Sequence, residues 1–222
     1  VDYHGMFKPS GMNVTYPNVL NFEGVRGMEN SKWHVYDAPQ YDVTMPFIRM
    51  LAGPVDYTPG AMRNAAKSCF RPVNDNPMSQ GTRCHQLAMY VAFEAPLQML
   101  ADNPTAYMKE QECTDFIASV PAVFDETIAL DGKVGSFLAI ARRSAKTWFI
   151  GALCNWNARE IVLDFSFLAD GNYSAEIFSD GINAGRNGTD YKKEILKINN
   201  KTRLTYQLAE GGGLAVKIIA AP

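Results

Sequence analysis

Two carboxylates, an imidazole, a lysine and an arginine lie close together near the beginning of the sequence, within residues 4–30: Glu23, Glu29, His4, Lys8 and Arg26. The residues around them are rich in Gly, Pro and Asn, which support the special backbone geometries of loops. Two carboxylates in such a loop can transfer protons or bind a hard cation. The chemistry alone leaves two interpretations equally open, a polar functional site and an ordinary surface loop.

The same stretch carries short motifs in a fixed order. They are His4, then Lys8-Pro9-Ser10-Gly11, then Thr15-Tyr16-Pro17-Asn18, then Glu23-Gly24, and finally Glu29. A further segment begins at Leu51 and reads Leu-Ala-Gly-Pro-Val-Asp-Tyr-Thr-Pro-Gly. In both places the sequence resembles glycoside hydrolase family 97, and the resemblance continues, more weakly, into the second half of the chain.

The resemblance implies roles for the two glutamates. Glu29 stands where the family keeps the general acid that protonates the glycosidic oxygen, and Glu23 stands where it keeps a carboxylate ligand of an active-site Ca²⁺ ion. Calcium takes about six to eight oxygen ligands, so we expect the others to come from elsewhere in the protein. The plainer alternative for Glu23 is a loop carboxylate paired with Arg26.

The residue after His4 distinguishes two branches of the family. Inverting members carry Glu there, which acts as a base, whereas this chain has Gly5. The chain is therefore similar to the retaining branch, whose Asp nucleophile comes from an earlier barrel strand and so lies outside this chain. Characterised members of that branch favour α-galactosides; an α-glucosidase or a β-L-arabinopyranosidase is the alternative within the family. Glu29 would act first as acid and then as base, which requires a raised pKa.

Three further residues are candidates for contacts with the substrate: His4, Lys8 and Asp56. For His4, the resemblance implies a contact with a sugar hydroxyl at the end of a barrel strand, and the alternative is a histidine that satisfies its own loop. A salt bridge is the plainer explanation for Lys8, and loop scaffolding is an equally good one for Asp56. We interpret His34 and His85 as structural. We interpret Trp33, Trp148 and Trp156 as core residues, with stacking on a sugar as the alternative.

The first half of the chain has the order of strand, loop and helix that β/α units show. Segments with the apolar composition of strands are residues 19–22 and 50–55. Apolar residues at three- and four-residue spacing predict a helix over 82–100, which Pro96 should kink or end early. The pair Asn103-Pro104 predicts the beginning of a second helix.

After residue 122 the apolar period shortens toward two. The predicted strands are residues 136–142, 148–154, 161–167, 173–178 and 214–219. Turn signals separate them, at Asp131-Gly132, Asp170-Gly171, Asp180-Gly181, Asn187-Gly188 and Asn199-Asn200. Short strands at such spacing favour an antiparallel β-sandwich, which we expect to pack directly on the first half.

Together these observations predict an α/β part followed by an all-β part. Residues 1–122 would be the C-terminal portion of a catalytic (β/α)8 TIM barrel, and residues 123–222 a C-terminal antiparallel β-sandwich domain. A complete barrel needs about 250 residues, so we expect a missing N-terminal part of the same protein and an inactive chain without it. A carbohydrate-binding module, with the acidic loop as a relic, is the alternative from another functional class.

Composition excludes several other functions. The formal charge is −2 with scattered Lys and Arg residues, which argues against a nucleic-acid partner. No apolar run is long enough for a membrane span, and no nucleotide-binding or transition-metal motif occurs. The four widely spaced Cys residues predict structural thiols, with one disulfide as the alternative. We expect an oligosaccharide or glycoside as substrate and a periplasmic or secreted bacterial location.

Overall fold

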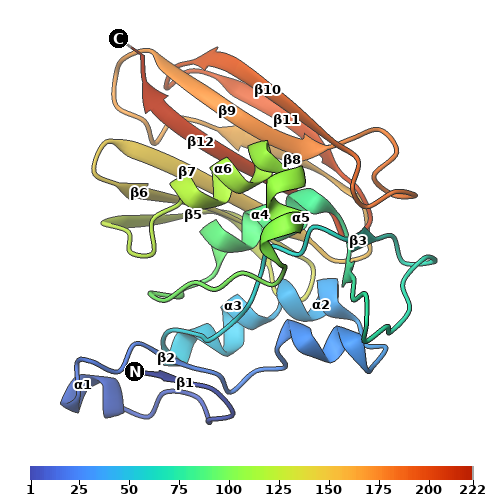
Figure 1. Ribbon diagram of the computed structural model, residues 1–222. Helices are drawn as coiled ribbons and strands as arrows, with labels where there is room; N and C mark the ends of the chain where they lie inside the picture. The colour runs from blue at the N-terminus through green and yellow to red at the C-terminus, as the bar shows by residue number, and fades with distance from the viewer. Residues whose placement is uncertain (222) are drawn as a thin grey trace.

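The computed structural model describes residues 1–221, so the last residue of the predicted sandwich lies outside the described part. The first half consists of short elements around one fully buried helix, and the second half is a two-layered arrangement of strands (Figure 1). The elements of the first half are β1 (Asp2–Tyr3), α1 (Met12–Thr15), β2 (Asn21–Phe22), η1 (Met28–Lys32), α2 (Ala38–Asp42), α3 (Met45–Ile48), η2 (Met50–Ala52), β3 (Asn64–Ala65), β4 (Ser79–Gln80), α4 (Arg83–Ala92), α5 (Pro104–Lys109) and α6 (Gln111–Ser119).

The strands of the first half are short and pair in parallel. β1 pairs with β2, and β3 pairs with β4. The predicted strand over 19–22 is confirmed as β2, but the strand predicted over 50–55 is wrong, because residues 50–52 form the 3-10 helix η2. Gly53, at φ 124°, ends that helix, and Val55 alone makes a parallel bridge with Phe22.

Both predicted helices are present, but the first is shorter than predicted and the second is divided in two. The first is confirmed as α4, which ends at Ala92, well before residue 100, and the backbone is already extended at Phe93. This agrees with an early end ahead of Pro96, since proline disfavours helical geometry in the residue before it. The second begins as predicted, with the Asn103 side chain accepting from the backbone N–H of Ala106, but it breaks into α5 and α6 at Glu110.

The second half forms one large antiparallel sheet and one small one. Its strands are β5 (Glu126–Lys133), β6 (Phe137–Ser144), β7 (Thr147–Cys154), β8 (Arg159–Asp164), β9 (Tyr173–Asp180), β10 (Tyr191–Ile198), β11 (Arg203–Leu208) and β12 (Gly213–Ala220). Six of them form the large sheet in the order β10-β9-β12-β7-β6-β5, and β8 pairs with β11. All five predicted strands of this half are therefore present, and β5, β10 and β11 were not predicted.

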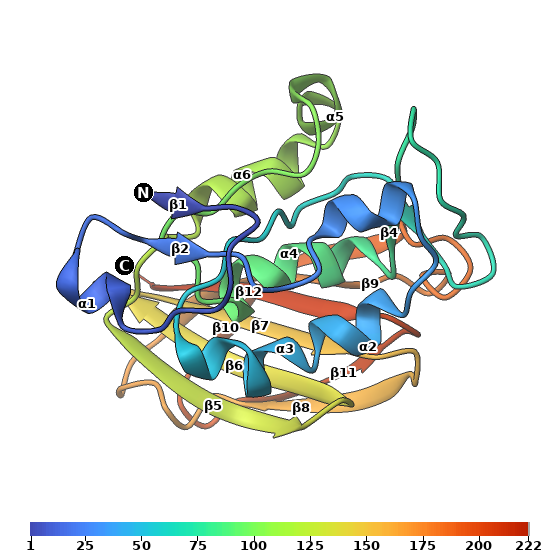
Figure 2. The ribbon, with the colours of Figure 1, turned by 90° about the horizontal axis from the view of Figure 1, so that it is seen from below.

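Alternation along the strands places a core on each face of the large sheet. Ile150 and Ala152 of β7 face the β8–β11 pair, whereas Phe149 and Leu153 face α4. The helix and the small sheet therefore cover opposite faces, as Figure 2 shows from below. Among residues 1–221, no helix is long and apolar enough to cross a membrane.

Two glycines let α4 lie very close to the sheet. A Cβ at Gly151 of β7 would lie 2.6 Å from the Ala88 carbonyl oxygen, and one at Gly213 of β12 would lie 2.6 Å from the Cys84 carbonyl carbon. Any larger residue would push the helix away. The direct packing of the two halves, which we expected from the sequence, is confirmed and depends on these two glycines.

Candidate functional site

Three candidate residues follow directly on paired positions of adjacent parallel segments. Tyr3 pairs with Phe22, Phe22 bridges to Val55, and the next residues are His4, Glu23 and Asp56. The Glu23 N–H donates to the Tyr3 carbonyl at 2.9 Å, and the Asp56 N–H donates to the Phe22 carbonyl at 3.0 Å. The three side chains therefore gather at one edge, where the strands end.

Within this group, His4 lies between two carboxylates. Its Nδ1 is 3.0 Å from Asp56 Oδ2 and 3.7 Å from Glu23 Oε2. The His4 side chain is 73% exposed, whereas those of Glu23 and Asp56 are 12% and 3% exposed. The hydrogen bond to Asp56, followed by the charge of Glu23, raises the pKa of the His4 imidazole. The Glu23 carboxylate also accepts from the N–H of Gly5.

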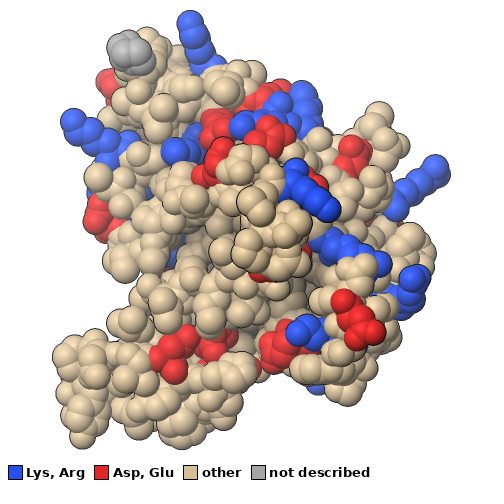
Figure 3. Space-filling model, viewed as in Figure 1, with Lys and Arg blue, Asp and Glu red and all other residues tan. Residues whose placement is uncertain are grey.

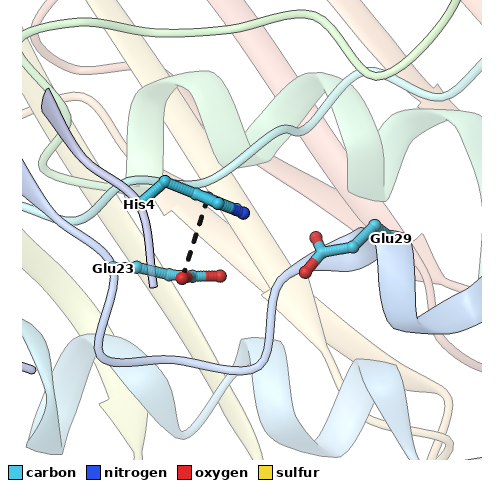
Figure 4. A group of neighbouring side chains, drawn as sticks. All are labelled: His4, Glu23 and Glu29. Carbon is cyan, nitrogen blue, oxygen red and sulfur yellow. Dashed lines mark ion pairs between the residues drawn. The ribbon is translucent and has the colours of Figure 1, made fainter. Parts of the chain in front are cut away.

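Glu29 reaches the same place from a different element. It is the second residue of η1, and its carboxylate points toward His4 and Glu23 (Figure 4). Ligand atoms of these three residues all lie within 4.8 Å of one another. The amide of Asn30 donates to Glu29 Oε1 at 3.4 Å and to the Gly27 carbonyl at 3.1 Å, which helps to fix the turn.

Two cavities meet at His4 and Glu29. The smaller, of about 120 Å³, is bounded by Glu23, Asp56 and Tyr57 as well. The larger, of about 320 Å³, lies on the side of Ser31 and Lys32. In the space-filling view, acidic side chains gather at the lower edge of the hollow between the N-terminal elements and the rest of the molecule (Figure 3). The arrangement combines two carboxylates and an imidazole with space on both sides of Glu29.

Buried residues that the sequence did not suggest support this edge. The Arg49 guanidinium donates to the carbonyls of Phe22, Glu23, Gly53 and Pro54, and so ties the β2 end to the loop before Val55. Burial lowers the pKa of Arg49. No local sequence signal marks this role, because its partners are carbonyl groups, which every residue carries.

A buried polar chain lies behind Asp56. The Tyr57 hydroxyl donates to Asp42 Oδ1 at 3.0 Å, and Asp42 Oδ2 lies 3.2 Å from His85 Nε2. The other ring nitrogen of His85 is 3.1 Å from the carbonyl oxygen of Gly212. The structural interpretation of His85 is confirmed, since both its ring nitrogens have buried partners.

The remaining candidates lie away from the two cavities. Lys8 is exposed and lines neither of them. The Arg26 guanidinium stacks over Tyr36, 5.1 Å from the ring centroid, and no ion pair joins it to Glu23 within residues 1–221. The prediction of a core position is confirmed for Trp148 and is wrong for Trp33, which is 54% exposed and donates to Asn74 Oδ1. All four cysteines are free thiols, so the alternative of a disulfide is wrong.

Comparison with known proteins gives consistent results. Residues 123–219 match the family described as "Glycosyl-hydrolase 97 C-terminal, oligomerisation". A retaining alpha-galactosidase of Bacteroides thetaiotaomicron is 54% identical over 220 residues, which are 98% of this chain and 33% of the relative. A probable retaining alpha-galactosidase of Streptomyces bingchenggensis is 34% identical over 151 residues, or 68% of this chain and 22% of the relative.

Solved structures agree with the sequence matches. A family 97 enzyme of Pseudoalteromonas sp. strain K8 in complex with acarbose has a TM-score of 0.88 and 34% identity, and the match covers all of this chain and 35% of that one. A beta-arabinopyranosidase has a TM-score of 0.82 and 25% identity over 98% of this chain and 34% of its own. This chain spans about a third of the length of these proteins. It belongs to glycoside hydrolase family 97.

Proposed function

We propose that this chain is part of a retaining α-galactosidase that removes terminal α-galactosides from oligosaccharides or simpler glycosides. The observation that carries the proposal is the position of the Glu29 carboxylate, beside His4 and Glu23 and between two cavities. The high identity to a retaining alpha-galactosidase supports the choice of sugar. A periplasmic or secreted location stays our prediction.

The catalytic half would be the last part of a (β/α)8 barrel, over residues 1–122, with the sandwich over 123–222. Parallel pairing of β1 with β2 and of β3 with β4 supports this proposal. So does the position of His4, Glu23 and Asp56 at the carboxyl ends of adjacent parallel segments, where barrel enzymes place their chemistry. A further part of the protein would complete the barrel and supply the nucleophile.

In the proposed reaction Glu29 donates its proton to the glycosidic oxygen as the bond to the anomeric carbon breaks. The sugar passes to the nucleophile, and Glu29 then takes a proton from the water that releases it. Gly5 carries no side chain that could activate a water from its position. The exposed His4 ring, oriented by Asp56, is placed to contact a sugar hydroxyl, and Lys8 could contribute only if it turns toward the site.

Calcium is the proposed metal. Glu23 would be the ligand that this chain supplies, because carboxylate oxygen is the ligand type that Ca²⁺ prefers, whereas Glu29 must keep its proton to act as the acid. The exposed imidazole of His4 suits calcium less well, so the further ligands would be oxygen atoms from other parts of the protein and water. A bound Ca²⁺ would supply a fixed positive charge that orients substrate hydroxyl groups.

One specific observation favours a second candidate activity, the hydrolysis of β-L-arabinopyranosides. The beta-arabinopyranosidase covers nearly the whole chain with a TM-score of 0.82, and β-L-arabinopyranosides share the ring stereochemistry of α-galactosides. An α-glucosidase is the third possibility within the family. A carbohydrate-binding module is less well supported, because no aromatic side chain of residues 123–221 is fully exposed on the surface to stack on a sugar.

The test uses the full-length protein that carries this chain. We expect hydrolysis of melibiose and of an aryl α-galactoside to exceed that of the matching α-glucoside and β-L-arabinopyranoside, and Glu29→Gln to abolish hydrolysis of melibiose. Glu210→Gln, on an exposed turn after β11, is the matched control. Melibiose hydrolysis that survives Glu29→Gln would overturn the assignment of the acid, and a preference for the glucoside would overturn the choice of sugar.

A further inference from the structure

We propose that Asn30 is a positioning residue for the general acid Glu29. Its side-chain amide holds one oxygen of the Glu29 carboxyl group and leaves the other, Oε2, to carry the proton that passes to the substrate. This inference rests on the proposed glycosidase function and goes beyond it, because it gives the two carboxyl oxygens different tasks. Asn30 itself lines neither cavity, so it acts through Glu29.

The Glu29 side chain is folded back over its own turn. A Cβ added at Gly27 would lie 2.8 Å from both Cδ and Oε1 of Glu29 and would overlap the carboxyl group. Gly27 is buried, and the carboxyl group fills the space that a larger residue would occupy. A half-buried glutamate has several rotamers available, so a single conformation needs a contact that holds it.

The amide of Asn30 supplies that contact. Its Nδ2 donates to the Gly27 carbonyl at 3.1 Å and to Glu29 Oε1 at 3.4 Å. The amide nitrogen carries two hydrogens and the amide oxygen carries none, so only the nitrogen can face two oxygen acceptors. Catalytic hydrogen bonds are often long before the substrate binds and tighten in the complex. The carboxyl group is thus tied to the carbonyl over which it lies.

The backbone of η1 holds Asn30 in place from both sides. The Asn30 N–H donates to the Gly27 carbonyl at 3.2 Å. The Asn30 carbonyl accepts from the N–H groups of Trp33 at 3.1 Å and of His34 at 2.9 Å. The amide donor is therefore oriented before it meets the carboxyl group, and little conformational entropy remains to be lost.

A fixed donor at Oε1 determines where the acid carries its proton. Oε1 accepts the amide hydrogen, so in the acid form of Glu29 the proton lies on Oε2. In the first step this proton moves to the glycosidic oxygen while the bond from that oxygen to the anomeric carbon breaks. The electron pair of the bond stays on the departing oxygen, and the nucleophile bonds to the anomeric carbon.

The same oxygen of Glu29 works in the second step. A water molecule bonds to the anomeric carbon, the bond to the nucleophile breaks, and Oε2 takes the proton that the water gives up. A hydrogen bond to a carboxylate is stronger than one to a neutral acid. The Asn30 amide therefore stabilises Glu29 most between the two steps, when Glu29 has given its proton away.

Other titratable groups lie around Glu29, and a substitution at Asn30 leaves all of them in place. On the strand ends, in the cavity linings and behind η1 these groups are His4, Glu23, Asp56, Lys32, Asp102 and Tyr36. The Tyr57 hydroxyl is turned toward Asp42 instead. A change in the pH dependence of catalysis that follows a substitution of Asn30 is therefore assigned to its contact with Glu29.

The experiment compares two substrates of the full-length protein that differ in their need for an acid. Melibiose loses a sugar alkoxide and requires the proton, whereas α-galactosyl fluoride loses fluoride, a stable anion. We expect Asn30→Ala to lower kcat/KM for melibiose about tenfold, as loss of one hydrogen bond to a charged group does, with less than about a twofold change for the fluoride. We compare kcat/KM because it excludes the second step, which both substrates share.

The pH dependence of kcat/KM gives a second measurement. Asn30→Asp keeps the size of the side chain but places a negative charge beside Glu29, which opposes ionisation of the acid. The alkaline limb of the melibiose profile should therefore move to higher pH, by about one unit. A residue that only supported the turn would change the rate equally at every pH and leave this limb in place.

The matched controls are Asn74→Ala and Asn74→Asp. Asn74 is exposed, and its Oδ1 accepts from Trp33 Nε1 at 3.3 Å, so it also holds the end of η1. Within residues 1–221 no hydrogen bond joins it to Glu29, and both variants should leave the two substrates and the pH profile unchanged.

Three results would overturn the positioning role in a protein that cleaves both galactosides. They are equal losses on melibiose and the fluoride in Asn30→Ala, no loss on melibiose in that variant, and an unmoved alkaline limb in Asn30→Asp. If the unaltered protein cleaves neither galactoside, the proposed α-galactosidase function fails and this inference fails with it.

Discussion

Asp56 holds the imidazole of His4, with Oδ2 of the aspartate 3.0 Å from Nδ1 of the histidine. The aspartate is almost fully buried and the histidine is mostly exposed, so a buried charge fixes a ring that faces outward. Asp56 is placed to orient His4, and although it lines the small cavity its side chain is only 3% exposed. The predicted substrate contact of Asp56 would therefore be secondary to its contact with His4.

Asp56→Asn should lower the pKa of His4. The hydrogen bond to Asp56 is the largest contribution that raises this pKa, and an amide keeps the shape while removing the charge. The measurement is an NMR titration of the His4 ring, with exposed His34 as the reference in the same sample. An unchanged His4 titration would show that Asp56 does not hold the ring in solution.

Gly27→Ala should impair catalysis while leaving stability nearly intact. A Cβ at this position would overlap the Glu29 carboxylate, 2.8 Å from its Cδ, and the side chain would have to swing away. The backbone at Gly27 has φ −66°, which any residue tolerates. Displacement of a catalytic group by about 1 Å can cost on the order of 100-fold in rate.

The comparison for this change is Gly185→Ala, where nothing lies within 4 Å of the added Cβ. Both variants should unfold within about 0.5 kcal/mol of the unaltered protein in urea, because neither opens a cavity nor buries a charge. Full activity of Gly27→Ala on melibiose would contradict the position of Glu29.

The free energy of unfolding should fall as the pH rises from about 4 to about 6, because Asp180 loses a proton that the folded state retains. Burial raises the pKa of this carboxyl to about 6, and its Oδ1 atom is buried without a hydrogen-bond partner. The folded state therefore keeps a proton that the unfolded state releases above its usual value of 3.8. The retained proton stabilises the folded state fully below pH 3.8, and this stabilisation is lost as the pH rises through 6. The free energy of unfolding should fall by roughly 3 kcal/mol over this range.

Urea unfolding at a series of pH values measures this effect. Asp180→Asn removes the titrating proton and should flatten the profile between pH 4 and 6, whereas Asp170→Asn, in an exposed turn, should not. If the slope were the same with and without Asp180→Asn, the buried carboxyl at the end of β9 would not be the group that titrates.

The released sugar should keep its anomeric configuration. In the proposed mechanism, Gly5 stands in place of a carboxylate, so the reaction passes through a nucleophile on the protein and not through a water activated from this position. Proton NMR during the first minutes of hydrolysis distinguishes α-galactose from β-galactose before mutarotation. Initial formation of the β-anomer would refute the retaining mechanism.

The sequence contained the residues that line the site but not the framework that supports them. The motifs identify His4, Glu23 and Glu29 because their types and spacing are distinctive. Arg49 could not be identified in this way, because it acts through four backbone carbonyls that become neighbours only after folding.

In two places the local sequence predicted the wrong secondary structure, because contacts with distant segments determined it instead. Asp131-Gly132 has the composition of a tight turn, yet it lies within β5, where a bulge between Ala129 and Asp131 absorbs the irregularity opposite β6. Residues 50–55 have the apolar composition of a strand, but Gly53 turns the chain so that only Val55 reaches Phe22. In both cases the neighbouring segment determined the structure, and a single sequence does not show which neighbour that is.

The contact between His85 and the Gly212 carbonyl connects the sheet to the candidate site through buried hydrogen bonds. From Gly212 the path passes through His85, Asp42 and Tyr57 and arrives beside Asp56. Helix α4 also packs closely against Gly151 of β7. Neither half can therefore unfold alone without breaking buried hydrogen bonds to the other. Heating should therefore melt both halves in a single cooperative transition, and the candidate site would be lost at the same temperature as the sheet.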